Sequence, residues 1–100
     1  METIQLYNQT EKLFKKSKFK VEFHWAFATE YSDTNGMHPR LLATKGKIAF
    51  DIYFDHSPNK KIHVFGGDIS ARKPKYVEEF PIDEHEKFIK YLTEILEKII

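Results

Sequence analysis

The sequence predicts an α+β domain, a two-layer sandwich in which an antiparallel meander of three or four strands carries an N-terminal and a C-terminal helix on one face. Three observations predict this class. Apolar residues recur at helical spacing near both ends of the chain, large apolar and polar residues alternate in between, and turn-forming clusters separate the alternating stretches. One apolar sheet face and two apolar helical stripes can bury each other as two layers.

The first helix is expected at residues 3–16. Its apolar side contains Leu6, Tyr7 and Phe14, and Thr3 is a candidate N-cap. The last helix is expected after Asp83, since Asp83 and Glu86 have the spacing of a capping box. It presents one apolar stripe made of Phe88, Ile89, Leu92, Ile95, Leu96 and Ile99.

Three stretches between the helices alternate clearly enough to predict strands. They are residues 18–30, 47–55 and 61–65, the last one ended by Gly66-Gly67. Turn clusters follow the first two, SDTNG at 32–36 and HSPNK at 56–60.

Two further stretches are ambiguous. In residues 37–45, Pro39 argues against a central strand, although residues 41–44 can pair with the next strand across Lys45-Gly46. Residues 68–81 contain two prolines and mixed polarity, so we expect a connector or a poor edge strand there.

Alternation also assigns the strand side chains to two faces. The large apolar set should face the helices, and the other set should form an open face, as an antiparallel sheet permits. That open face consists of Lys20, Glu22, His24, Asp51, Tyr53, Asp55, Lys61, His63 and Phe65. A five-residue loop at 56–60 would set Tyr53 opposite His63 and Asp55 opposite Lys61.

Length and composition indicate one domain, residues 1–100, with 41% hydrophobic and 15% aromatic residues to build its core. The chain contains no cysteine, which favours a reducing compartment, and we expect a cytoplasmic protein. No apolar run approaches the roughly 20 residues that span a bilayer, so no membrane association is expected.

A nucleic-acid interface is the alternative that the charge distribution supports. The net charge is only +1, but residues 38–75 carry eight Lys or Arg against three Asp. The candidate residues are Arg40, Lys45, Lys47, Arg72, Lys73 and Lys75. The order helix–strand–strand–strand–helix resembles that of the double-stranded RNA-binding domain, which implies RNA binding. The Gly-Pro-x-His loop and Lys-Lys-x-Ala-Lys helix start of that family are absent, and the last helix opens with the acidic IDEHE.

Catalysis and metal binding find little support in the sequence. The ligand-type residues His24, Asp51, Asp55, His56 and His63 have no recognised metal-site spacing, so we expect no metal and no cofactor. Glu22 with His24, or Asp51 with His63, are candidate acid–base pairs, but an open face offers neither burial nor a cleft. No enzyme is predicted.

The remaining interpretation is a binding protein that acts without catalysis, as an inhibitor or antagonist of a host or cognate protein. Phage and plasmid inhibitors of host defence and immunity proteins are often small, cysteine-free domains of this kind, an argument from class alone. The candidate partner-binding residues are Glu22, His24, Asp51, Tyr53, His63 and Phe65 on the open face, and Tyr31, Met37, His38 and Arg40 in the 31–40 loop. The alternatives are an ordinary solvated sheet face and hairpin tip. An uncovered strand edge would also allow two copies to pair as a homodimer.

Overall fold

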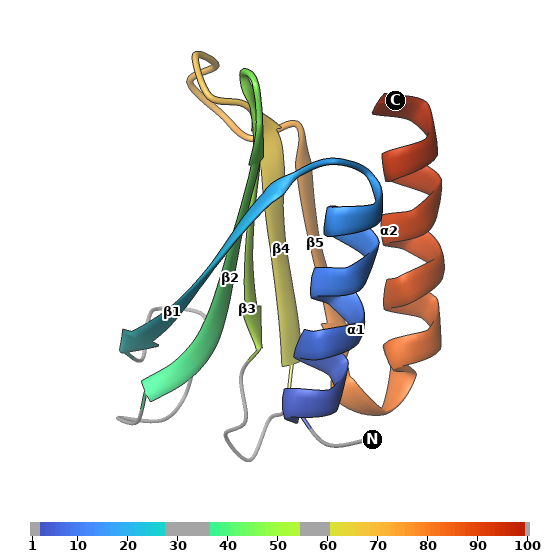
Figure 1. Ribbon diagram of the computed structural model, residues 1–100. Helices are drawn as coiled ribbons and strands as arrows, with labels where there is room; N and C mark the ends of the chain where they lie inside the picture. The colour runs from blue at the N-terminus through green and yellow to red at the C-terminus, as the bar shows by residue number, and fades with distance from the viewer. Residues whose placement is uncertain (1–2, 28–36, 55–60, 100) are drawn as a thin grey trace.

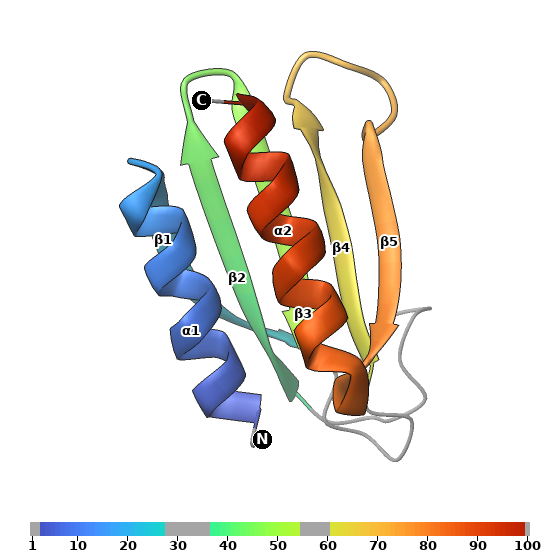
Figure 2. The same ribbon diagram turned by 90° about the vertical axis from the view of Figure 1, so that its right-hand side faces the viewer.

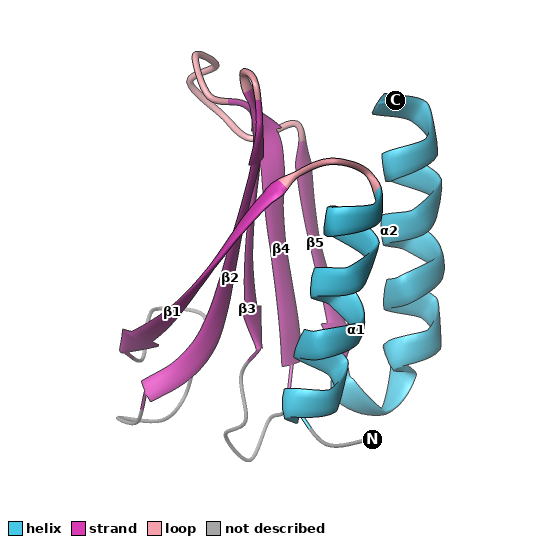
Figure 3. Ribbon diagram, viewed as in Figure 1, coloured by secondary structure: helices cyan, strands magenta, loops and turns pink. Residues whose placement is uncertain are grey.

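Five antiparallel strands form one sheet in the order β1-β2-β3-β4-β5, and two helices cover one of its faces (Figures 1 and 3). The elements are α1 (Thr3–Lys16), β1 (Lys20–Phe27), β2 (Met37–Lys45), β3 (Ile48–Phe54), β4 (Lys61–Asp68), β5 (Tyr76–Pro81), the 3₁₀ turn η1 (Ile82–Glu84) and α2 (His85–Ile99). The computed structural model describes residues 3–27, 37–54 and 61–99, without the side chains of 25–27 and 37–38.

The predicted fold class is confirmed, but the sheet has five strands where three or four were expected. Residues 37–45 form a complete strand. Within residues 68–81, where a connector or a poor edge strand was expected, Tyr76–Pro81 forms the edge strand β5. The element order therefore differs from the three-stranded order that suggested a double-stranded RNA-binding domain. Figure 2 shows both helices in front of the sheet, with β5 at its far edge.

Pro39 is tolerated in β2, an inner strand, because it lies beyond the part of β2 that pairs with β3. That pairing runs from Lys45 opposite Ile48 to Arg40 opposite Tyr53, whereas Pro39 is opposite Trp25 of β1. Among the described residues, Pro39 has a strand partner on one side only. The missing N–H is tolerated there as it is in an edge strand.

The glycine pair at 66–67 was expected to end the fourth strand, yet β4 continues through it to Asp68. Gly66 lies opposite Phe50, and a Cβ at Gly66 would overlap the Phe50 ring. Glycine therefore makes room for a large core side chain instead of breaking the strand. Gly67 has a φ of +150°, which favours glycine, and a Cβ there would lie 2.9 Å from the backbone nitrogen of Lys75.

The core lies between the sheet and the helices and is rich in aromatic rings. The fully buried side chains include Phe14, Phe50, Phe54, Phe88, Leu6, Leu41, Ile52, Ile62, Leu92 and Val64. Ring contacts join the layers, with Phe14 5.4 Å from Phe50 and Phe54 6.2 Å from Phe88 between ring centres. Alternation assigns Ile48, Phe50, Ile52, Phe54, Ile62 and Val64 to the inward side, and all of them belong to or pack against the core.

The ends of the helices are only partly as predicted. The first helix has its predicted bounds, Thr3–Lys16. At the other end of the chain, Asp83 lies inside η1 and α2 begins at His85, so the capping box that was expected at Asp83 and Glu86 is wrong. Neither α1 nor α2 has the length and apolar character needed to cross a membrane.

Candidate binding face of the sheet

The sheet side turned away from the helices carries two rows of cross-strand neighbours, which we call the outer face. The first row is His24, Arg40, Tyr53, His63 and Glu79, and the second is Glu22, Leu42, Asp51, Phe65 and Val77. The predicted pairing of Tyr53 with His63 is confirmed, while Asp55 lies outside the described residues. All six residues predicted for binding from the open face therefore lie on the same side of the sheet.

A charged cluster occupies the middle of this face. Arg40 donates from Nε and Nη2 to the two carboxylate oxygens of Asp51, at 2.7 and 2.6 Å. Its guanidinium carbon lies 5.5 Å from the centre of the Tyr53 ring. The hydrogen bonds to Asp51 raise the pKa of Arg40, and burial followed by the negative charge of Asp51 raises the pKa of Tyr53. Ring and ion pair thus hold each other in one arrangement.

His63 is buried, not exposed as an open face would require. It is 4% exposed, and its Nδ1 lies 3.5 Å from Oε2 of Glu79. In this fold β5 places Glu79 directly opposite His63, so that β4 is an inner strand. Glu79 also accepts a hydrogen bond of 2.7 Å from Lys61 Nζ, which is the main cause of the lowered pKa of Glu79.

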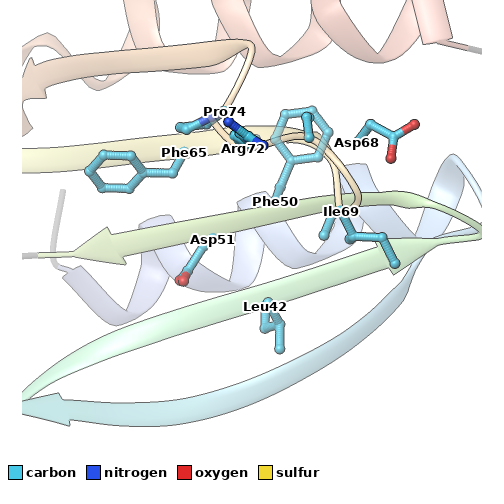
Figure 4. A pocket seen from close by; sticks show the side chains of 12 residues that line it. Leu42, Phe50, Asp51, Phe65, Asp68, Ile69, Arg72 and Pro74 are labelled. Carbon is cyan, nitrogen blue, oxygen red and sulfur yellow. The ribbon is translucent and has the colours of Figure 1, made fainter.

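The second row is the more apolar one. The rings of Tyr53 and Phe65 meet edge to face, 6.2 Å apart, and Val77 is 58% exposed. Beside Phe65 lies a pocket of about 280 Å³ (Figure 4). Its lining includes Leu42, Ala49, Asp51, Phe65, Gly67, Ile69, Arg72 and Pro74. The outer face therefore combines fixed charges, two rings and a small hollow.

The 31–40 loop is only partly described. Tyr31 lies outside the described residues, while Met37 and His38 belong to β2 with side chains that are not described. Arg40 is a strand residue of the outer face, and the expectation that it is a loop residue is wrong.

The six basic residues proposed for nucleic-acid binding do not form one patch. Arg40 is engaged by Asp51, and Lys45 Nζ donates to the Ser17 carbonyl at 2.9 Å while lying over the Phe19 ring. The four others are exposed and gather at one end of the sheet: Lys47, Arg72, Lys73 and Lys75. A hydrogen bond of 2.7 Å from Ile69 N to the Lys47 carbonyl joins their two loops there.

The candidate acid–base pairs differ in outcome. His24 Nε2 lies 3.8 Å from a Glu22 oxygen, with both side chains about half exposed. Asp51 is opposite Phe65 and bound to Arg40, so it is not paired with His63. No group of three or more His, Asp or Glu able to hold a metal ion occurs within residues 3–27, 37–54 and 61–99.

The sequence interpretation missed Leu42, Val77 and Glu79, because it assigned no definite strand to their segments. The sequence did contain a signal for β5. Tyr76 and Phe80 are four residues apart, a spacing that puts both rings on the same face of a strand. Both rings do face the helices, and Phe80 lies 5.8 Å from Phe88.

Comparisons of the chain with protein-family models, with curated proteins and with solved structures found no match.

Proposed function

We propose that the chain is a binding protein that docks its outer face on a partner protein, without catalysis of its own, and thereby inhibits that partner. One observation carries this proposal. The two helices cover only one face of the sheet, and the other face presents Tyr53, Phe65 and the 58%-exposed Val77 around a fixed Arg40–Asp51 pair.

The composition of this face resembles the central part of protein interfaces. Tyrosine and arginine are enriched at such interfaces and often contribute most of the binding energy. Arg40 and Tyr53 are already held by Asp51 and by each other. Less side-chain freedom is therefore lost on docking than for two independent surface residues.

Inhibition is the part of the proposal that rests on class. A small domain seated on a partner excludes other molecules from the surface it covers. Immunity proteins and phage antagonists of host defence act in this way, and we propose the same mode for this chain.

The test is capture of partners from a lysate of the source organism with tagged protein, with and without nuclease. We expect one stoichiometric protein that survives nuclease and is lost with the double variant Tyr53→Ala, Phe65→Ala. Because these rings contact each other, the variant must first show an unchanged circular dichroism spectrum. Undiminished capture by a folded double variant would contradict the proposal.

Two single variants sharpen the test. Val77→Glu changes an exposed side chain on the outer face, and Ile4→Glu changes a 50%-exposed side chain on the helical layer. Both should fold, since neither is buried. We expect the first to weaken capture and the second to leave it unchanged.

Nucleic-acid binding is a second candidate, favoured by the four exposed basic residues at one end of the sheet, Lys47, Arg72, Lys73 and Lys75. It predicts capture that vanishes with nuclease and an affinity that falls steeply with salt. Substituting Arg72 and Lys73 by Glu would then abolish binding, whereas the variants of Tyr53 and Val77 would have little effect.

A further inference from the structure

The hollow beside Phe65 exists because two neighbouring positions of the outer face have a very small side chain or none. Next to the two rows of that face, Ala49 of β3 lies opposite Gly67 of β4. Neither fills the space above the sheet, and the β4–β5 connection folds back to form a wall with Ile69 and Pro74. The result is the pocket of about 280 Å³ shown in Figure 4. This volume is just below the roughly 300–1,000 Å³ of small-molecule sites.

The interior of the pocket is mostly apolar. Leu42, Ala49, Phe65, Ile69, Ala71 and Pro74 supply carbon surface. Of the two carboxylates in the lining, Asp51 is paired with Arg40 and Asp68 accepts hydrogen bonds from the backbone N–H and the hydroxyl of Ser70. These hydrogen bonds lower the pKa of Asp68, so it stays ionised, and phosphate would be repelled from the interior.

The rim of the pocket is basic. Arg72 belongs to the lining, Lys73 follows it in the same connection, and the hydrogen bond from Ile69 N to the Lys47 carbonyl brings the β2–β3 turn alongside. Lys75 is turned away from this rim, since its Nζ lies 5.5 Å from the centre of the Tyr76 ring, which faces the helices. Lys47, Arg72 and Lys73 are exposed, and the exposed Asp68 lies among them. Such a rim attracts negative charge around an apolar hollow.

We propose that this pocket receives one large apolar side chain from a partner segment whose neighbouring residues are acidic, so that the apolar group fills the hollow and the carboxylates meet the basic rim. The inference rests on the proposed function and names the chemistry of the partner. An apolar anchor in a pocket with a polar rim is the arrangement of an interface hot spot. The size of the hollow and its internal carboxylates favour a peptide side chain over a nucleotide.

The experiment selects linear random peptides, displayed on phage, against the intact protein. A synthetic copy of the selected peptide, labelled with fluorescein, is then titrated by fluorescence anisotropy. We expect selected sequences with a large apolar residue next to Asp or Glu. Ala49→Leu fills the hollow from the outer face, and we expect it to weaken binding at least about ten-fold. Arg72→Glu with Lys73→Glu should weaken it similarly, and added salt should weaken the wild type.

Lys12→Glu is the matched control, since it reverses an exposed charge on α1, and it should change binding by less than about two-fold. Four outcomes would overturn the inference: no enriched sequence, enriched sequences without acidic residues, a folded Ala49→Leu that binds normally, or displacement of the peptide by oligothymidine. A variant of Ala49 that does not fold leaves the charge-reversal pair to decide.

Failure here is distinguishable from failure of the proposed function. If the captured partner is lost with Tyr53→Ala, Phe65→Ala but retained by Ala49→Leu, the outer face binds and the pocket does not serve as anchor. If the double variant captures its partner normally, the proposed function fails whatever peptides were selected.

Discussion

Arg40 and Asp51 are each about one-third exposed or less, and they form a two-point ion pair diagonally across β2 and β3. Removing one partner leaves the other charged side chain partly buried and without its counter-charge. We therefore expect Arg40→Ala and Asp51→Ala each to destabilise the fold, with a coupling energy of about 1–2 kcal/mol in a double-mutant cycle. Urea denaturation of the four proteins measures it.

Arg40→Lys separates geometry from charge in this cycle. Lysine retains the positive charge but cannot make two parallel hydrogen bonds to one carboxylate, nor lie flat over the Tyr53 ring. We expect it to recover less than half of the coupling. Full recovery would show that only the charge of residue 40 matters.

Tyr7 is a second residue with a specific consequence. Its side chain is 3% exposed and contacts Phe23 and Phe54, at 5.0 and 5.7 Å between ring centres. Among the described residues its hydroxyl has no hydrogen-bond partner. Tyr7→Phe keeps the ring and removes an unsatisfied polar group, so we expect stability unchanged or raised by up to about 1 kcal/mol.

Tyr7→Ala is the contrasting variant, since it removes both ring contacts and should cost about 3–5 kcal/mol. Thermal and urea denaturation at neutral pH distinguish the two substitutions. A clear loss of stability in Tyr7→Phe would mean that the hydroxyl is bonded in the folded protein.

The same hydroxyl predicts a response to alkali. Burial, and then the charge of Glu11, raise the pKa of Tyr7 to about 12. In the unfolded chain a tyrosine ionises near pH ~10, so the unfolded state loses this proton first. The stabilisation is complete below pH ~10 and is lost as the pH rises through the folded-state pKa.

The denaturation midpoint should therefore fall above pH ~10, and fall less in Tyr7→Phe. Tyr53 and Tyr91 also have raised pKa values and keep part of the decline in that variant. Equal declines in the two proteins would assign the effect to those tyrosines alone.

At the scale of the element, α1 ends in a hydrogen-bonded turn in which Lys18 has a strained backbone conformation. Phe19 N donates to the Phe14 carbonyl and Lys18 N to the Lys15 carbonyl, each at 3.0 Å, while the Phe14 and Phe19 rings lie 5.2 Å apart. This is the Schellman arrangement, with Lys18 at the left-handed position with a φ of +70°. Glycine is the usual residue there, because a Cβ costs energy.

We expect Lys18→Gly to stabilise the protein by about 0.5–1 kcal/mol, the relief of strain exceeding the entropy that glycine adds to the unfolded chain. Lys16→Gly, in the last turn of the helix, should instead cost about 0.5–1 kcal/mol. Urea denaturation of both variants decides. A destabilised Lys18→Gly would show that Lys18 makes a compensating contact.

Elements were predictable where one local pattern decided them. The bounds of α1 and the inward residues of β3 follow from periodicity alone. The strand β2 and the extension of β4 through Gly66 depend on neighbours far along the chain. Judged from their own segments, Pro39 and Gly66 both disfavour a strand. Pro39 fits because the pairing with β3 ends at Arg40, and Gly66 fits because the Phe50 ring occupies the space of a side chain.

At the scale of the whole molecule, the outer face was predictable in those strands whose residues alternate clearly between apolar and polar. Tyr53 opposite His63 follows from strand period and loop length, and the structure has that pair. The burial of His63 does not follow, since alternation assigns this side chain to the open face and the structure leaves it 4% exposed. The pocket between β3, β4 and Pro74 likewise needs the folded path of the β4–β5 connection.

The two-layer arrangement gives the final prediction, which concerns the complex with the captured partner. Two highly exposed apolar side chains lie on or beside the proposed docking side, Ile69 at 64% and Val77 at 58% exposure, and Ile4 at 50% lies on the helical layer. Hydroxyl-radical footprinting oxidises such side chains in proportion to their exposure.

In the complex we expect the oxidation rates of Ile69 and Val77 to fall several-fold, because the partner excludes water from the outer face. The rate of Ile4 should stay the same, since α1 covers the opposite face of the sheet. Protection of Ile4 with Val77 unchanged would place the partner on the helices and refute docking through the outer face.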